Sequence, residues 1–202
     1  MVIALSRQFS RFRLPGPRLV ALGLMATGLV LFAQGAWLGV KADIAQVLLA
    51  QSWTRAIDGE SASTPWPWAD FRPVARLSVP SLGEHAIILS DGGAEALAFG
   101  PALLDASARP GEPGVSVIAA HRDTHFAFLE AVRPGDLIVL EQAGEAPLRY
   151  RVTGMDVVDA ERSGIEPGIG PARLALVTCW PFGSLVPGPD RYVVWAEPAA
   201  RL

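Results

Sequence analysis

Toward the C-terminus, the run Leu174-Ala175-Leu176-Val177-Thr178-Cys179-Trp180 is almost entirely apolar and ends beside the chain's single cysteine. A short apolar run bounded by turn-forming residues predicts a buried β-strand. Pro181 follows directly, and proline lacks the N–H that a strand ladder needs. The sequence therefore predicts that Cys179 lies at a strand end, at the mouth of a cleft.

Two other side chains with useful chemistry also stand at the ends of apolar runs. His121 closes the run 114–120, and Arg191 opens the run 191–196. Cysteine attacks carbonyl groups as the thiolate, which forms more readily beside a cation. An arginine is suited to hold a peptide carbonyl or an oxyanion. If the strands are neighbours, the three residues form a cysteine acyl-transfer site; the alternative is a buried, inert cysteine.

The remaining pattern indicates a mostly β protein. Strands are predicted at 74–79, 85–89, 114–120, 137–142, 148–158, 173–179 and 191–196, with short helical segments at 102–104 and 126–132. Many short strands separated by turn signals predict a mostly antiparallel barrel or sandwich.

The N-terminal part reads as a membrane anchor. Residues 19–40 carry no charge, and about 20 apolar residues span a bilayer. Arginines concentrate in residues 1–18, so the positive-inside rule predicts a cytoplasmic N-terminus and an extracytoplasmic domain. A cleaved signal peptide is the alternative, with a small-residue site at 33–35, but the apolar stretch exceeds the usual 7–15 residues. We expect a linker at 41–70 and a catalytic domain at 71–202.

The predicted linker has two parts. Residues 42–56 show helical spacing, with an expected buried stripe of Ile44, Val47, Leu48 and Trp53. A segment rich in proline, serine and tryptophan follows, in which Trp66 and Trp68 are expected to pack on the edge of the domain.

Charge and residue types narrow the possible partners. After residue 41 the chain holds 12 basic and 20 acidic residues, which excludes the clustered positive charge of a nucleic-acid interface. Zinc binding by His121, His125 and Cys179 is a weak alternative, because there is no second cysteine and no H-E-x-x-H glutamate. No acidic cluster has the spacing of a calcium site. We therefore expect no metal and no cofactor.

These motifs resemble one family. The run 176–179 followed by Arg191 resembles the T-L-x-T-C…R signature of the sortases, with valine in place of one leucine. His121-Arg122-Asp123-Thr124-His125-Phe126 resembles the sortase histidine motif in its Gram-negative (class GN) form, as does the Pro-Trp segment at 65–70. The resemblance covers roughly residues 42–198.

That resemblance implies a closed sortase β-barrel of about eight strands behind a transmembrane helix. It also implies a thiol-protease-like transpeptidase that cleaves an LPxTG-like motif near a protein's C-terminus. Cys179 would form the thioacyl-enzyme, His121 would act as acid and base, and Arg191 would bind the substrate and stabilise the oxyanion. An amine acceptor would then resolve the intermediate. Thr178, Trp180 and His125 are further candidates for substrate contact.

Other readings remain open at this point. An L,D-transpeptidase places histidine two residues before its cysteine, where this chain has Val177. A papain-like enzyme has its cysteine before its histidine, and this chain reverses that order. A non-catalytic, membrane-tethered β-domain that binds a peptide or protein partner is the alternative from another class. For the enzyme we expect a single-pass protein of the inner membrane with a periplasmic catalytic domain.

Overall fold

The computed structural model describes residues 16–60, 64–166, 170–186 and 188–199. Contacts divide the chain into two units, Met1–Asp43 and Ile44–Leu202. Helix α1 (Pro17–Ile57) includes residues of both units. The basic segment predicted to be cytoplasmic falls largely outside the described residues.

The first part of α1 matches the predicted anchor in composition. The helix is long and apolar enough to cross a membrane, and its most apolar window has no buried residue. A soluble helix of this hydrophobicity would bury at least one face. Signal sequences share this length and composition. The helix therefore supports membrane insertion but does not distinguish an uncleaved anchor from a cleaved signal peptide.

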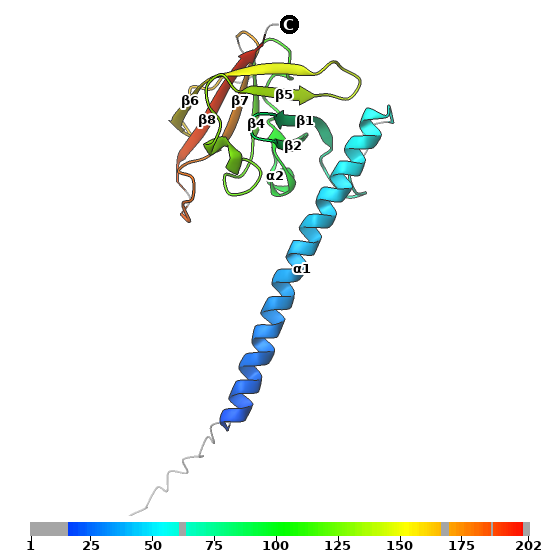
Figure 1. Cartoon of the computed structure of the whole chain (residues 1–202), viewed down its shortest axis with the longest axis vertical. Helices are drawn as coiled ribbons and strands as arrows, with labels where there is room; N and C mark the ends of the chain where they lie inside the picture. The colour runs from blue at the N-terminus through cyan, green and yellow to red at the C-terminus, as the bar shows by residue number, and fades with distance from the viewer. Residues whose placement is uncertain (1–15, 61–63, 167–169, 187, 200–202) are drawn as a thin grey trace, which may run out of the picture. The chain divides into compact units, whose positions relative to one another are not determined.

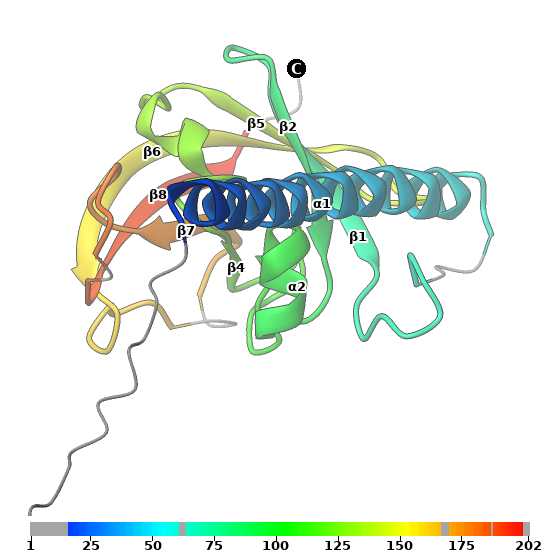
Figure 2. The ribbon, with the colours of Figure 1, turned by 90° about the horizontal axis from the view of Figure 1, so that it is seen from below.

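The second unit is a closed barrel of eight strands (Figures 1 and 2). In chain order the elements after α1 are β1 (Pro73–Val79), β2 (Glu84–Leu89), α2 (Ala94–Phe99), β3 (Ala102–Leu103), β4 (Val115–Ala119), η1 (Ala127–Glu130), β5 (Leu137–Glu141), β6 (Leu148–Asp159), β7 (Arg173–Cys179) and β8 (Asp190–Pro198). Around the barrel the strand order is β1-β2-β3-β4-β7-β8-β6-β5, and β5 pairs with β1 to close it. This confirms the predicted closed barrel.

The sheet is mixed. Most neighbours are antiparallel, but β2 pairs with β3 and β4 pairs with β7 in parallel. β4 and β7 are buried on both faces, which explains why their sequences are continuous apolar runs instead of alternating ones. The predicted helical turn at 102–104 is wrong, because Ala102 and Leu103 form β3 between β2 and β4.

The barrel interior holds the main core. Residues at alternate strand positions, such as Leu77, Ile118, Leu176 and Val194, are fully or almost fully buried there. Their neighbours on the outer face of β4, β7 and β8 form a second cluster that includes Val117, Ala175 and Val193. This alternation decides on which face of the barrel each site residue lies.

Residues 44–57 of α1 pack within the barrel unit, but on a different stripe from the one predicted. The buried residues are Ala45, Leu49, Trp53 and Ala56, whereas Ile44 and Val47 are more than half exposed. Of the four expected residues, Trp53 alone is fully buried. The prediction was wrong because this part of the helix carries apolar side chains on more than one face. The large apolar residues alone therefore did not identify the face that packs.

The segment after the helix packs through one of its two predicted tryptophans. Trp66 contacts the rings of Phe71 and Phe99 at centroid distances of 5.5 and 4.9 Å. These rings join Leu49 and Leu89 in a third apolar cluster. Trp68, by contrast, is 77% exposed, so the expected packing role is confirmed for Trp66 and wrong for Trp68.

Candidate active site

The β4–β7 pairing brings two of the predicted site residues to one end of the barrel. Ala119 pairs with Val177 in parallel register, so His121 and Cys179 each stand two residues beyond a matched pair. Parallel strands end at the same edge of a sheet. The sequence predicted a joint site on the condition that these strands are neighbours. The parallel pairing of β4 with β7 meets that condition.

The third residue lies opposite the cysteine. Cys179 and Arg191 are direct cross-strand partners at the end of β7 and the start of β8. Directly opposed residues of antiparallel strands point to the same face. Alternation along β7 places Cys179 on the outer face with Val177 and Ala175. Cys179 is partly exposed and has no disulfide partner, as suits an accessible thiol.

Arg191 is held by the loop that precedes it. Its Nη1 donates hydrogen bonds to the carbonyl oxygens of Gly188 (3.0 Å) and Asp190 (2.9 Å). Among the described residues, neither Nε nor Nη2 has a hydrogen-bond partner. The guanidinium is thus oriented by two bonds and keeps donors free for a ligand beside Cys179.

Thr178 connects the ends of the two parallel strands. Its side chain is 2% exposed and faces the barrel interior, and its hydroxyl donates to the carbonyl of Ala120 at 2.8 Å. The backbone N–H of Ala120 in turn donates to the carbonyl of Val177. These bonds fix the residue before His121 against the residue before Cys179. A buried side chain engaged in this way positions the site, whereas the sequence suggested substrate contact for Thr178.

Trp180 also faces packing partners. Its ring stacks on Tyr192 at 5.5 Å and meets Phe182 edge-on at 5.7 Å. Tyr192 contacts Phe182 as well, so the three rings form one cluster at the base of the β7–β8 loop. Substrate contact by Trp180 stays a prediction.

A shallow apolar groove leads to Arg191 along the outer face of the barrel. It encloses about 270 Å³. Its lining residues are Leu104, Val117, Ala119, Val158, Ala160, Ser163, Ile165, Val177 and Arg191. Arg191, the cross-strand partner of Cys179, is the one charged residue among them. The groove is suited to an extended peptide with an apolar side chain whose carbonyl reaches the guanidinium.

Arg122 crosslinks the histidine loop to the β7–β8 loop. Its guanidinium is 7% exposed, and Nη2 donates to the carbonyls of Ser184 and Val186. Nε lies 3.4 Å from a carboxylate oxygen of the exposed Asp123. Arg122 is therefore a buried cation that is paired with an exposed carboxylate.

We expect Arg122→Met to loosen the β7–β8 loop with little change in global stability. Hydrogen bonds to a charged donor contribute about 1.5–3 kcal/mol each, so losing two should raise loop opening by roughly 100-fold or more. Replacing a buried cation by an apolar chain is often neutral for folding. Limited proteolysis within residues 181–189 should accelerate while the melting temperature changes little. The control is Arg162→Met, which removes only an exposed ion pair with Asp159. Equal proteolysis in both variants would contradict the crosslink.

His125 belongs to the same loop as His121 but is more buried. Burial, and secondarily the electrostatic interaction with nearby His121, lowers the pKa of His125 below its ordinary value of 6.5. The loop folds back at this point, because the N–H of Phe126 donates to the carbonyl of His121 at 3.0 Å. Within the described residues no three His, Cys, Asp or Glu side chains are grouped as metal ligands would be.

The depressed pKa of His125 predicts an acid-sensitive fold. The unfolded chain takes up this proton near pH 6.5, whereas the folded chain resists it, so stability falls as pH drops below about 6.5. The loss levels off once the pH is below the pKa of the folded state. His125→Asn should therefore lose less stability than the wild type between pH 7 and pH 5. Urea unfolding followed by tryptophan fluorescence measures the difference, and parallel pH curves would contradict it.

Comparison with known proteins agrees with this architecture. The chain folds as a closed β-barrel with a cysteine, a histidine and an arginine at the ends of neighbouring strands. A family model described as "Sortase domain" matches residues 77–199. The chain therefore belongs to the sortase family.

Individual relatives are distant. The chain is 28% identical over 123 residues to Sortase D of Bacillus subtilis (strain 168), a match that covers 60% of this chain and 61% of the relative. Sortase A from Corynebacterium diphtheriae aligns with a TM-score of 0.59 at 23% identity, over 78% of this chain and 85% of that structure. A pilus-related Sortase C of Group B Streptococcus aligns with a TM-score of 0.56 at 24% identity, over 63% and 68%. At such identities the structural likeness establishes the sortase-like fold.

Proposed function

We propose that this protein is a membrane-anchored cysteine transpeptidase that cleaves an LPxTG-like sorting signal and transfers the acyl group to an amine. The observation that carries the proposal is the strand register, in which Arg191 lies opposite Cys179 and His121 stands at the matching position beyond β4. We further propose that the enzyme belongs to the Gram-negative class of sortases. It acts by thiol-protease-like chemistry and needs no cofactor.

The chemistry follows from the place of each side chain. An extended peptide lies in the apolar groove and brings its scissile carbonyl to Cys179. The thiolate attacks the carbonyl carbon, and the free donors of Arg191 hold the oxyanion that forms. His121 protonates the leaving amine, and the C–N bond breaks to give a thioester on Cys179. An incoming amine then attacks this thioester, and His121 accepts the released proton.

The membrane assignment extends the same proposal. The apolar part of α1 serves as a single-pass anchor, and the arginines before it keep the N-terminus in the cytoplasm. The barrel is then on the periplasmic side of the inner membrane, where the protein substrates and the amine acceptor are presented. The proposed organisation is a cytoplasmic segment at 1–18, a transmembrane anchor at 19–40, a linker at 41–70 and a catalytic domain at 71–202.

Intact mass spectrometry of the detergent-solubilised full chain tests the function directly. Incubation with an LPxTG-type peptide should add the mass of the acyl fragment, and peptide mapping should place it on Cys179. If Cys179 forms no adduct and is not alkylated by iodoacetamide, it is a buried, inert cysteine. That result would contradict the transpeptidase function. Peptide binding without any adduct would favour the non-catalytic β-domain.

A further inference from the structure

His121 is bracketed by hydrogen bonds on both sides along the chain. On one side Ala120 is joined to the end of β7, because its N–H donates to the carbonyl of Val177 and its own carbonyl accepts from the Thr178 hydroxyl. On the other side Arg122 donates to carbonyls of the β7–β8 loop. Both sets of bonds end on the stretch of chain that carries the thiol. The two neighbours of the histidine are thus fixed to the same segment as the cysteine.

The second of these connections is made by a buried side chain. Arg122 is buried, and its Nη2 donates to the carbonyl oxygen of Ser184 and, at 3.4 Å, to that of Val186. Ser184 itself shapes the turn that presents these carbonyls. Its hydroxyl donates to the Val186 carbonyl at 3.0 Å and accepts from the Val186 N–H at 3.2 Å. One guanidinium nitrogen therefore joins the residue after His121 to a turn that has internal bonds of its own.

The burial of this cation is costly for folding. Among the described residues, Nε and Nη1 of Arg122 are buried atoms without a hydrogen-bond partner. The nearest opposite charge is the exposed carboxylate of Asp123, 3.4 Å from Nε. A buried charge whose donors are incompletely paired destabilises the folded state. The stability of the barrel therefore does not explain an arginine at this position, whereas the connection between the two loops does.

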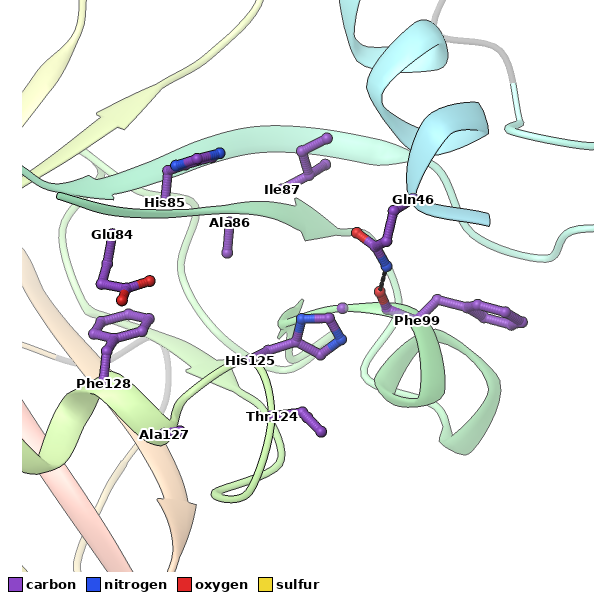
Figure 3. A pocket seen from close by; sticks show the side chains of 11 residues that line it. Gln46, Glu84, His85, Ala86, Ile87, Phe99, Thr124, His125, Ala127 and Phe128 are labelled. Atoms are coloured by element: carbon purple, nitrogen blue, oxygen red, sulfur yellow. Dashed lines mark hydrogen bonds between the residues drawn. The ribbon is translucent and has the colours of Figure 1, made fainter. Parts of the chain in front are cut away.

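Toward β2 the histidine loop has no comparable connection. There Thr124 and His125 border a hollow of about 490 Å³, which Figure 3 shows from close by. The hydrogen bond drawn in that hollow involves neither residue, and in the described part of the chain neither side chain has a hydrogen-bond partner. The next anchor is Phe126, which is fully buried. Between Ala120 and Phe126, the side chain that holds the loop in place is therefore that of Arg122.

We infer that Arg122 is a positioning residue, which holds His121 beside Cys179 by fixing the histidine loop to the β7–β8 loop. The inference rests on the transpeptidase function proposed above. In that reaction the thiolate attacks the peptide carbonyl, His121 gives a proton to the leaving nitrogen, and the C–N bond breaks to leave a thioester. Proton transfer requires hydrogen-bond distance, and a misplacement of about 1 Å slows a reaction about 100-fold. Arg122 itself touches no reacting atom.

The test uses two substrates that form the same thioester but differ in their need for an acid. The first is an LPxTG-type peptide, whose leaving amine must be protonated. The second is the p-nitrophenyl ester of the same acyl peptide, whose C–O bond breaks to release nitrophenolate without a proton. Both leave the same acyl group on Cys179. Intact mass spectrometry of the full chain in detergent, with samples quenched over time, therefore measures both acylation rates, and the melting temperature reports folding.

For Arg122→Met we expect the maximal rate of acylation by the peptide to fall roughly 10-fold to 100-fold, as part of the contribution of general acid catalysis. The rate with the ester should fall by no more than about threefold, because that reaction needs no acid. Arg122→Lys should recover much of the loss, since an ammonium can also donate to the two carbonyls. Arg76→Met removes an exposed arginine of β1 that does not line the groove, and this control should match the wild type with both substrates.

Two further variants separate positioning from other effects. When His121 is already replaced by alanine, Arg122→Met should cause no additional loss with the peptide, because the arginine acts through the missing histidine. Ser184→Ala acts on the other side of the contact, because it removes the bonds that shape the turn. It should slow acylation by the peptide about threefold, which is the scale of one ordinary hydrogen bond. This exposed-loop variant also provides the test if Arg122→Met does not fold.

The opposite results are equally specific. Equal losses with the peptide and the ester would overturn the inference, because the arginine would then act on peptide binding or on the oxyanion donor Arg191. A further loss when Arg122→Met is added to His121→Ala would show that it acts independently of the histidine. Unchanged acylation by the peptide in both Arg122→Met and Ser184→Ala would show that the contact has no role in the reaction. If the wild type forms no thioester from the peptide, the transpeptidase function itself is contradicted.

Discussion

Cys179→Ala will abolish transpeptidation while the barrel stays folded. No other thiol exists in the chain, and a hydroxyl would lack a strong general base here. Loss of a catalytic nucleophile costs on the order of 10⁴-fold or more in kcat. The side chain lies partly exposed at the end of β7, so its removal leaves no large cavity. Product formation from an LPxTG-type peptide and the melting temperature are the two readouts.

The matched control for this variant is Thr178→Val. It keeps the shape of the neighbouring side chain but removes the hydroxyl that bonds Ala120, so it should slow the reaction without abolishing it. Peptide binding by Cys179→Ala should persist, because the groove residues are untouched. Cleavage of the peptide by Cys179→Ala would show that the nucleophile is another group.

Arg191→Lys should lower kcat by roughly 10²–10³-fold, which is the usual cost of losing an oxyanion donor. An ammonium is a point charge and does not reproduce a planar guanidinium that bonds two carbonyls while offering further donors. The binding of the peptide should weaken less than the turnover. Steady-state kinetics with separate kcat and KM values provide the measurement.

Arg173→Lys is a suitable control at the other end of β7. Arg173 lies near Glu197 at 3.7 Å and over the Trp195 ring at 4.5 Å, contacts that a lysine largely keeps. It is not among the residues that line the groove. Comparable activity in Arg191→Lys and the wild type would contradict the oxyanion role of Arg191.

Local sequence patterns selected the three residues of the candidate site, and their catalytic roles stay predictions. Each stands at the boundary between an apolar run and a turn, and such boundaries are visible in a single sequence. Which strands are neighbours is a different matter. The parallel pairing of β4 with β7 joins segments more than 50 residues apart, and only the closed barrel shows it.

Other features lacked a readable signal or had one that was overlooked. β3 has two residues, too few for any period to appear. α2 was not predicted, although Ala-Glu-Ala-Leu at its start has high helix propensity. The pocket around His125 combines Gln46, Glu84 and the histidine loop, which nothing in the linear order connects. The burial of the Thr178 side chain was also not readable from the sequence, because its position in the motif suggested substrate contact.

The position of β8 has a consequence for how this protein is made. Within the described residues β8 is the last strand, yet it lies between β7 and β6 and not at an edge. Until it emerges from the ribosome, both neighbours lack a hydrogen-bonding partner along one side, and the barrel stays open. Arg191 arrives with the same strand. A chain that stops short of residue 190 therefore lacks both the closed fold and the proposed oxyanion donor, so a competent thiol site requires that β8 has been made.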